Sequence, residues 1–172
     1  MIVFKITGMF FLFLSSVFCS KQITSKIKKR VYELEEIDNI LNDFIVSINV
    51  GLYDVSFLLS EAIKRTKTKY HDFLCEVKDN LEKKSSNDFS KIWFDCLKHY
   101  HFDITLEEKI LLENIGASLS FNDKNRMIKQ LTLLQTSIEN QIQKARKDKD
   151  TKVSLYEKMG VLVGGFLVII FI

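Results

Sequence analysis

Charged residues stop well short of both ends of this 172-residue chain. Residues 6–19 and 159–172 carry none, whereas residues 20–158 hold all 22 acidic residues and every basic residue except Lys5. Each apolar run is 14 residues long, about 21 Å as a helix against a hydrocarbon core of ~30 Å. The first run extends back to Ile2, because Lys5 can snorkel to the headgroups. The pattern predicts an N-terminal membrane anchor at 1–19, a water-facing domain at 20–158 and a C-terminal membrane segment at 159–172.

The basic residues beside the two apolar runs predict which side of the membrane the middle domain occupies. Five of them follow the first run within residues 21–30, and six precede the second within residues 144–158. The positive-inside rule then puts the domain in the cytoplasm, and these side chains would contact anionic lipid headgroups. The residues assigned this role are Lys26, Lys28, Lys29, Arg30, Lys144, Arg146 and Lys147. A cleaved leader is the alternative for the first run, but the bulky Phe18 makes a poor cleavage site.

The middle of the chain favours long helices joined by short loops. It contains no proline, and its apolar residues recur three and four positions apart. Six helices are predicted, over about 23–52, 55–63, 70–81, 89–100, 106–119 and 123–145, and no breaker separates the last from the C-terminal segment. The expected helix ends and caps are Gly51, Asp54 or Ser56, the stretch Ser85-Ser86-Asn87-Asp88, Thr105 with Glu108, and Asn122 or Asp123. We therefore predict an all-α protein, with a bundle of about six helices between two transmembrane helices.

Few residues could carry chemistry. Cys96, His99 and His101 are close in sequence and could contribute to a soft metal site. A second Cys/His pair with ligand spacing is missing, since His71 and Cys75 lie on another predicted helix. Cys96 also falls within an apolar stripe, where a free cysteine behaves as a small hydrophobe. A structural role is therefore favoured over metal binding.

Other features argue against an enzyme. No nucleophile elbow, phosphate-binding loop or metalloprotease motif is present. The adjacent acidic residues Glu33, Glu35 and Glu36 are expected on a solvated helix face. A net charge of +3 is too small to suggest a nucleic-acid partner, and three cysteines do not make a disulfide framework. We expect no catalytic residue, no metal and no cofactor.

The glycines of the second half predict close helix packing. Gly160 and Gly164 form a Gly-x-x-x-Gly pair, which Gly165 follows. Small residues one turn apart let membrane helices approach each other, so we expect these three to pack against a partner helix or the first segment. Gly116, late in the fifth predicted helix, is expected to mark either a local turn or a close helix contact.

Several of these residues also form spaced motifs. The stretch 156–165 combines a tyrosine, Met159-Gly160 and a Gly-rich apolar tail, and a Leu-x-x-Ile-Gly-x-x-Leu pattern is followed by an aspartate at position 123. The residues involved are Trp93, Leu112, Gly116, Leu119, Asp123 and Tyr156. With the order of anchor, basic stretch, helical domain and second anchor, they resemble the stage III sporulation protein AB family. Ser120 departs from that pattern, where the family usually has a second glycine.

The resemblance implies a role in endospore formation. The family belongs to the assembly that links mother cell and forespore, and its helical domain is similar to those of type II secretion and type IV pilus platform proteins. By that likeness the chain would be a non-enzymatic scaffold in the mother-cell membrane around the forespore. Its cytoplasmic domain would dock the ATPase of the same system and couple it to other membrane proteins of the channel complex.

Two other function classes remain open on the residues alone. One is a secreted surface protein with a cleaved leader and a C-terminal lipid-anchor signal, although the residues before the tail are charged rather than small. The other is a membrane-bound metal enzyme, which would rest on Cys96 and His99 alone.

Overall fold

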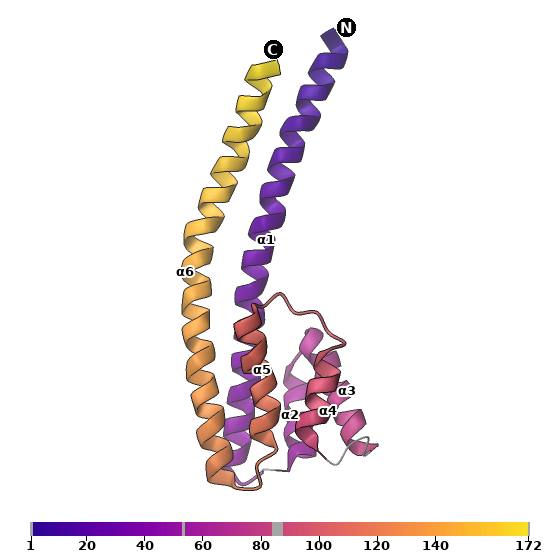
Figure 1. The fold of residues 1–172 in the computed structure, drawn as a ribbon, viewed down its shortest axis with the longest axis vertical. Coiled ribbons are helices and arrows are strands. Elements are labelled where there is room, and N and C mark those ends of the chain that lie inside the picture. Colours follow the sequence, from indigo (N-terminus) through magenta and orange to yellow (C-terminus); the bar gives the residue numbers. More distant parts are fainter. Residues whose placement is uncertain (1, 53, 84–87, 172) are drawn as a thin grey trace. The chain divides into compact units, whose positions relative to one another are not determined.

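Six helices account for nearly all of the regular structure. The computed structural model describes the backbone of residues 2–52, 54–83 and 88–171, and the side chains of these residues other than 2–7, 9–13, 164, 167–168 and 170–171. The helices are α1 (Ile2–Asn49), α2 (Val55–Arg65), α3 (Lys69–Glu82), α4 (Phe89–Leu97), α5 (Leu106–Leu119) and α6 (Lys124–Phe171) (Figure 1). No strand occurs in these described stretches. The prediction of an all-α protein with about six helices is confirmed.

The first and last helices are far longer than the other four. α1 and α6 each contain 48 residues, so the predicted domain boundaries after residues 19 and 158 lie inside continuous helices. The sixth helix does run on toward the C-terminus, as the lack of a breaker indicated. Within the part of the chain that the structure describes, no helix is both long enough and apolar enough to cross a membrane.

The chain forms two compact units. One, which we call the helix pair, comprises Met1–Val31 and Gln143–Ile172, and the other, the bundle, comprises Tyr32–Ile142. α1 and α6 each contribute residues to both units. Within the bundle, α2 packs on α3, α3 on α4 and α4 on α5.

The helix ends follow the local rules that the sequence indicated. Gly51 ends α1 with a φ of 95°, a left-handed conformation that suits glycine. The next amide, of Leu52, donates to the Ser47 carbonyl at 3.0 Å, as in a Schellman motif. Asp54, not Ser56, caps α2 by accepting from the Phe57 N–H at 3.0 Å. The remaining caps are Thr68 at α3, Asp88 at α4, the Thr105–Glu108 capping box at α5 and Asp123 at α6.

The predicted apolar stripes form the core of the bundle, with exceptions at their ends. Ile23 and Leu52 are exposed, because Leu52 lies beyond the last turn of α1 and Ile23 lies in the helix pair. α4 ends at Leu97, so Tyr100 lies in the following loop and not in the helix. The Tyr100 ring still contacts Phe73 edge-on, with ring centroids 5.8 Å apart. Tyr100 therefore packs on the bundle as the periodicity predicted, but from a loop and not from a helix.

Trp93 is the centre of the packing between α4 and α5. Its side chain is 1% exposed, and its indole N–H donates to the Leu112 carbonyl at 2.9 Å. One turn further along α5, a Cβ atom added to Gly116 would lie 2.3 Å from the Trp93 Cγ. Phe73 meets the same indole edge-on at 4.8 Å between centroids. Gly116 thus marks a close helix contact, one of the two interpretations that the sequence left open.

Replacing Gly116 by alanine should destabilise the bundle. Overpacking against Trp93 should outweigh the ~1 kcal/mol that alanine gains in helix propensity, for a net loss of about 1–2 kcal/mol in the free energy of unfolding. Urea unfolding of the full chain in detergent, followed by the fluorescence of its single tryptophan, measures this. Asn114→Ala, on the exposed side of the same helix, is the control and should change stability by less than about 0.5 kcal/mol. Equal unfolding midpoints for both variants would contradict the assignment.

Candidate interaction surfaces

The helix pair is held together closely at Gly160. This glycine is buried, and the Ser16 hydroxyl of α1 donates to its carbonyl oxygen at 2.9 Å. A Cβ atom added to Gly160 would lie 2.1 Å from the Ser20 Oγ and 2.8 Å from the Ser20 Cβ. The two helices run antiparallel here, since Ser16 faces Gly160 and Arg30 lies 3.6 Å from Asp148. Only a glycine fits at position 160 without moving α1 away from α6.

The other two glycines of the C-terminal segment differ from Gly160. A Cβ atom at Gly165 would meet nothing within 4 Å. The surroundings of Gly164 lie outside the described residues, so its predicted packing role stays a prediction. Of the three glycines, the structure therefore describes a contact with α1 for Gly160.

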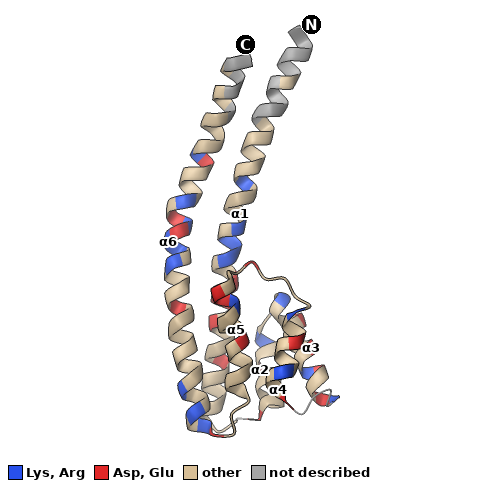
Figure 2. Cartoon of the chain, in the orientation of Figure 1, with Lys and Arg blue, Asp and Glu red and all other residues tan. Residues whose placement is uncertain are grey.

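The predicted basic residues lie on the helix pair, where Figure 2 shows them along both α1 and α6. All seven are exposed except Arg30, which is half-buried. Lys28 lies 3.6 Å from Glu157, and Asp148 lies 3.6 Å from Arg30 and 3.0 Å from Lys152. Exposed ion pairs of this kind contribute roughly 0–1 kcal/mol each, so they add little to the stability of the helix pair.

The two units carry opposite net charges. Residues 20–31 and 143–158 contain eleven basic and three acidic residues, whereas residues 32–142 contain thirteen basic and nineteen acidic ones. The helix pair thus has a net charge of +8 over this stretch, and the bundle has −6. The small overall charge conceals this separation. A basic helix pair suits an anionic lipid surface, and an acidic bundle suits a basic protein surface.

Glu33 holds the loop between α4 and α5 against α1. Its side chain is buried, with one carboxylate oxygen accepting from Lys69 Nζ at 2.8 Å and the other from the Asp103 N–H at 2.8 Å. Lys69 Nζ also donates to the His101 carbonyl at 3.0 Å. The loop is therefore fixed by one carboxylate and one ammonium group.

The expectation that Glu33, Glu35 and Glu36 lie on a solvated face is wrong for Glu33, which is 5% exposed, and only partly right for the half-buried Glu35 and Glu36. Glu33 is covered by a loop 70 residues further along the chain. A local pattern of acidic and basic residues carries no information about such a partner.

Tyr70 lies beside this carboxylate. Its ring stacks on Phe102 at 4.4 Å between centroids, and its side chain is 1% exposed. The hydroxyl oxygen has no partner in hydrogen-bond geometry among the described residues, although the Glu33 carboxylate is close enough to favour its protonated form. Burial, followed by the negative charges of Glu33, Glu36 and Glu108, raises the pKa of Tyr70 above its ordinary value. The hydroxyl is therefore a desolvated, neutral group.

The residues considered for a metal site each interact with another group. Cys96 is buried, and its sulfur accepts from the Asn80 side chain at 3.3 Å. His99 is exposed and lies 2.7 Å from a Glu76 carboxylate oxygen through its Nδ1. The backbone carbonyl of His101 accepts a hydrogen bond from Lys69 Nζ. No group of three or more His, Cys, Asp or Glu side chains among the described residues could hold a metal ion.

The pKa values of Cys75, Cys96 and Tyr100 are all raised, which does not favour their reactive, deprotonated forms. The sulfur of Cys75 lies 3.9 Å from the His71 ring, but burial, with the charges of Asp79 and Asp72, raises the pKa of its thiol. Burial likewise raises the pKa of Cys96. Burial and Glu76 raise the pKa of Tyr100 to about 12. Higher pKa values leave both thiols protonated at neutral pH, and the thiolate is the nucleophilic form.

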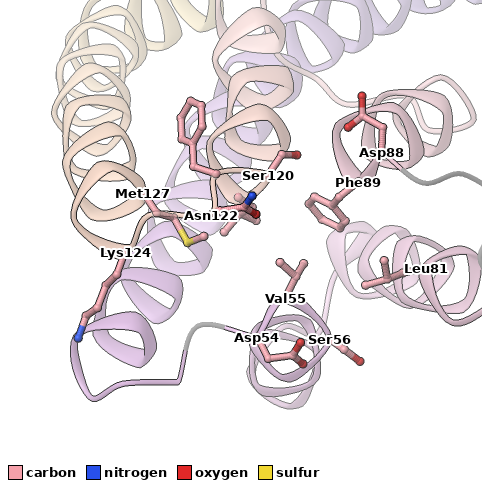
Figure 3. A pocket seen from close by; sticks show the side chains of 12 residues that line it. Asp54, Val55, Ser56, Leu81, Asp88, Phe89, Ser120, Asn122, Lys124 and Met127 are labelled. Atoms are coloured by element: carbon pink, nitrogen blue, oxygen red, sulfur yellow. The ribbon is translucent and has the colours of Figure 1, made fainter.

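A groove of about 650 Å³ opens in the bundle where five helices begin or end (Figure 3). It takes residues from the starts of α2, α4 and α6 and from the ends of α3 and α5. Its apolar lining consists of Val55, Leu81, Phe89, Leu119, Phe121 and Met127, and its polar lining of Asp54, Ser56, Asp88, Ser120, Asn122 and Lys124. Sequence reasoning identified Asp54 and Asp88 only as caps, because the groove exists only once the helix ends meet.

Comparison with known proteins identifies the family. The sequence profile of the family described as stage III sporulation protein AB (spore_III_AB) matches residues 5–172. The chain belongs to the stage III sporulation protein AB family. The resemblance inferred from its motifs is thereby confirmed, and the protein is a sporulation protein. Among curated proteins, none matches the chain at the sequence level.

A solved structure supports the fold of this sporulation family member. A chain titled "Stage III sporulation protein AB (SpoIIIAB)" superposes with a TM-score of 0.65 and is 18% identical. The match covers 72% of this chain and 98% of that one. At this identity the likeness shows that the two proteins share a fold.

The family-motif residues of the sporulation protein have structural roles. Trp93, Leu112 and Gly116 form the α4–α5 contact described above. Leu119 is buried at the end of α5 and lines the groove. Asp123 accepts from the Asn125 and Arg126 amides at the start of α6. Tyr156 is half-buried in α6, one turn before Gly160. The motif therefore maintains the packing and the ends of the helices.

Replacing Gly160 by leucine should separate the helix pair, because the side chain would occupy the position of Ser20. Lys28→Cys with Glu157→Cys, in a chain without native cysteines, allows cross-linking of α1 to α6 by a short bis-maleimide. We expect the cross-linked fraction to fall several-fold in Gly160→Leu. In Gly165→Leu, the matched control, it should stay at the level of the parent. Equal cross-linking in the two leucine variants would show that Gly160 is not a close contact.

Replacing Tyr70 by phenylalanine should stabilise the bundle. Removal of a buried hydroxyl without a hydrogen bond removes its desolvation cost, so the free energy of unfolding should rise by about 1 kcal/mol. Urea unfolding of the full chain measures the change, with Tyr32→Phe, an exposed tyrosine, as the neutral control. A loss of stability in Tyr70→Phe would mean that the hydroxyl has a favourable interaction.

Proposed function

We propose that the chain is a non-enzymatic membrane scaffold of the complex that joins mother cell and forespore during endospore formation. The bundle docks the cytoplasmic ATPase of the same system, and the two terminal segments hold the protein in the mother-cell membrane around the forespore. Membership of the stage III sporulation protein AB family supports the setting. The coupled role, rather than a motor role, is supported by the absence of a phosphate-binding loop motif from the sequence.

The continuity of α1 and α6 is the observation that carries this proposal. Each helix extends over 48 residues, from the bundle into one of the apolar ends, without a break in its hydrogen bonding. Neither helix contains a proline, a common cause of sharp kinks. In this proposal, a displacement at the bundle end of either helix reaches the apolar residues through that same helix.

The distribution of charge supports the membrane part of the proposal. Eleven basic residues lie between the apolar ends and the bundle, against three acidic ones. Such a belt favours the cytoplasmic side of a membrane, where anionic lipids add about 1 kcal/mol per basic residue near the surface. The glycine contact at position 160 would bring the two apolar segments together.

Thiol accessibility tests the sidedness that the scaffold requires. Leu106, which is 76% exposed, is replaced by cysteine in a chain without native cysteines, and the protein is produced in non-sporulating cells. A membrane-impermeant maleimide should label this site only after the membrane is opened. A cysteine appended after Ile172 is the control, and it should be labelled in intact cells. Labelling of Leu106→Cys in intact cells would favour the surface-protein alternative.

Co-purification tests the docking of the ATPase. The tagged full chain is isolated in mild detergent from sporulating cells, and the ATPase of the same system is detected by immunoblotting. We expect it to be retained, and retention should survive a salt wash of moderate ionic strength. Its absence from the purified complex, with the other membrane proteins present, would contradict the docking role.

A further inference from the structure

The groove at the helix ends leaves apolar side chains uncovered. Val55, Leu81 and Phe121 are half-buried, so each still reaches solvent, while Phe89 and Met127 beneath them are buried. An apolar wall next to solvent is typical of a surface that another molecule covers. A methionine in such a wall adapts to varied side chains.

The polar groups around the groove are all at its rim. Asp54, Asp88, Ser120 and Asn122 are exposed, and none of the polar side chains that line the groove is buried. Sites for small ligands combine an apolar cavity with a few buried, precisely placed polar groups. An open groove with polar groups only at the rim suits a protein segment instead.

Charge at the rim favours a cationic occupant. Asp54 and Asp88 cap α2 and α4 by accepting from the Phe57 and Ser90 amides, so two carboxylates lie at the rim. Lys124 is the only basic residue among the described residues of the lining, and its ammonium group donates to the Asn49 carbonyl at 3.1 Å. Figure 3 shows this side chain pointing away from the groove, in contrast to Met127. The bundle as a whole has a net charge of −6.

We propose that this groove is the docking site for a segment of the partner ATPase that presents one bulky apolar side chain with a lysine or arginine within a helical turn of it. The apolar side chain packs on Val55 and Phe89, and the cation pairs with Asp54 at the acidic rim. This inference rests on the proposed function, because it names the ATPase as the partner.

The position of the groove fits a coupling role. An occupant would contact the ends of five helices at once, among them the first turn of α6 through Met127. α6 then continues without interruption to Phe171. A segment that pushes on this turn acts directly on the helix that leads to the C-terminal apolar residues.

Charge removal without loss of the caps tests the proposal. Asparagine caps helices as well as aspartate does, so Asp54→Asn with Asp88→Asn should leave the thermal unfolding midpoint unchanged. Binding of the purified ATPase to the full chain in nanodiscs is measured by surface plasmon resonance at several salt concentrations. We expect the double variant to bind about tenfold more weakly and with a smaller dependence on salt. Val55→Lys adds a positive charge inside the groove, which would repel the cation of the ATPase segment, and should weaken binding further.

A matched control and a cross-link complete the test. Glu139→Gln removes an exposed charge of α6 about 18 Å along the helix from Met127 and should bind like the parent. A photo-reactive benzoylphenylalanine at Ser56 should cross-link to the ATPase, whereas the same residue at Leu106 should not.

The outcomes separate the inference from the proposed function. Tight ATPase binding that is equal in the parent, the groove variants and the control would overturn the groove and leave the docking role standing. Loss of affinity in the groove variants alone supports both. No binding to the parent chain would overturn both, and a cross-link from Ser56 to a second copy of this chain would overturn the ATPase as the occupant.

Discussion

The close approach of α4 and α5 at Trp93 and Gly116 is the contact on which the short helices of the bundle depend. The indole fills the space that any larger residue at position 116 would need, and its N–H satisfies a carbonyl of the facing helix. Phe73 and Phe89 pack on the remaining faces of the ring, at 4.8 and 6.0 Å between centroids. One side chain thus joins α3, α4 and α5. The end of α5, which forms one wall of the groove, is placed by this contact.

The second constraint is the separation of charge along two uninterrupted helices. α1 and α6 carry apolar residues at one end, basic residues next, and a mixed but acidic bundle after that. Each segment suits a different environment, namely hydrocarbon, anionic headgroups and a basic protein partner. The proposed scaffold between a membrane complex and an ATPase would use these three properties in this order.

Local chemistry made a large part of the fold predictable. Spacings of three and four residues located the helices, and short-range signals such as Gly51, Asp54 and the Thr105–Glu108 box located their ends. These signals work because their partners lie within a few residues. Predictions failed where the partner was distant. Glu33 is buried by a loop 70 residues further along the chain. Tyr100 lies in a loop after α4, where its ring contacts Phe73 on α3.

The sequence by itself determined the helical class, the family and the order of apolar, basic and acidic segments, because composition and local spacing are sufficient for these. Only the tertiary structure decided which helix each glycine packs against. Gly116 lies against Trp93 of α4 and Gly160 against Ser20 of α1, and nothing in the sequence around either glycine names that partner. It also decided where the helix ends converge. The groove between Val55, Phe89 and Met127 joins residues from three separate helices, and only long-range packing brings such residues to one surface.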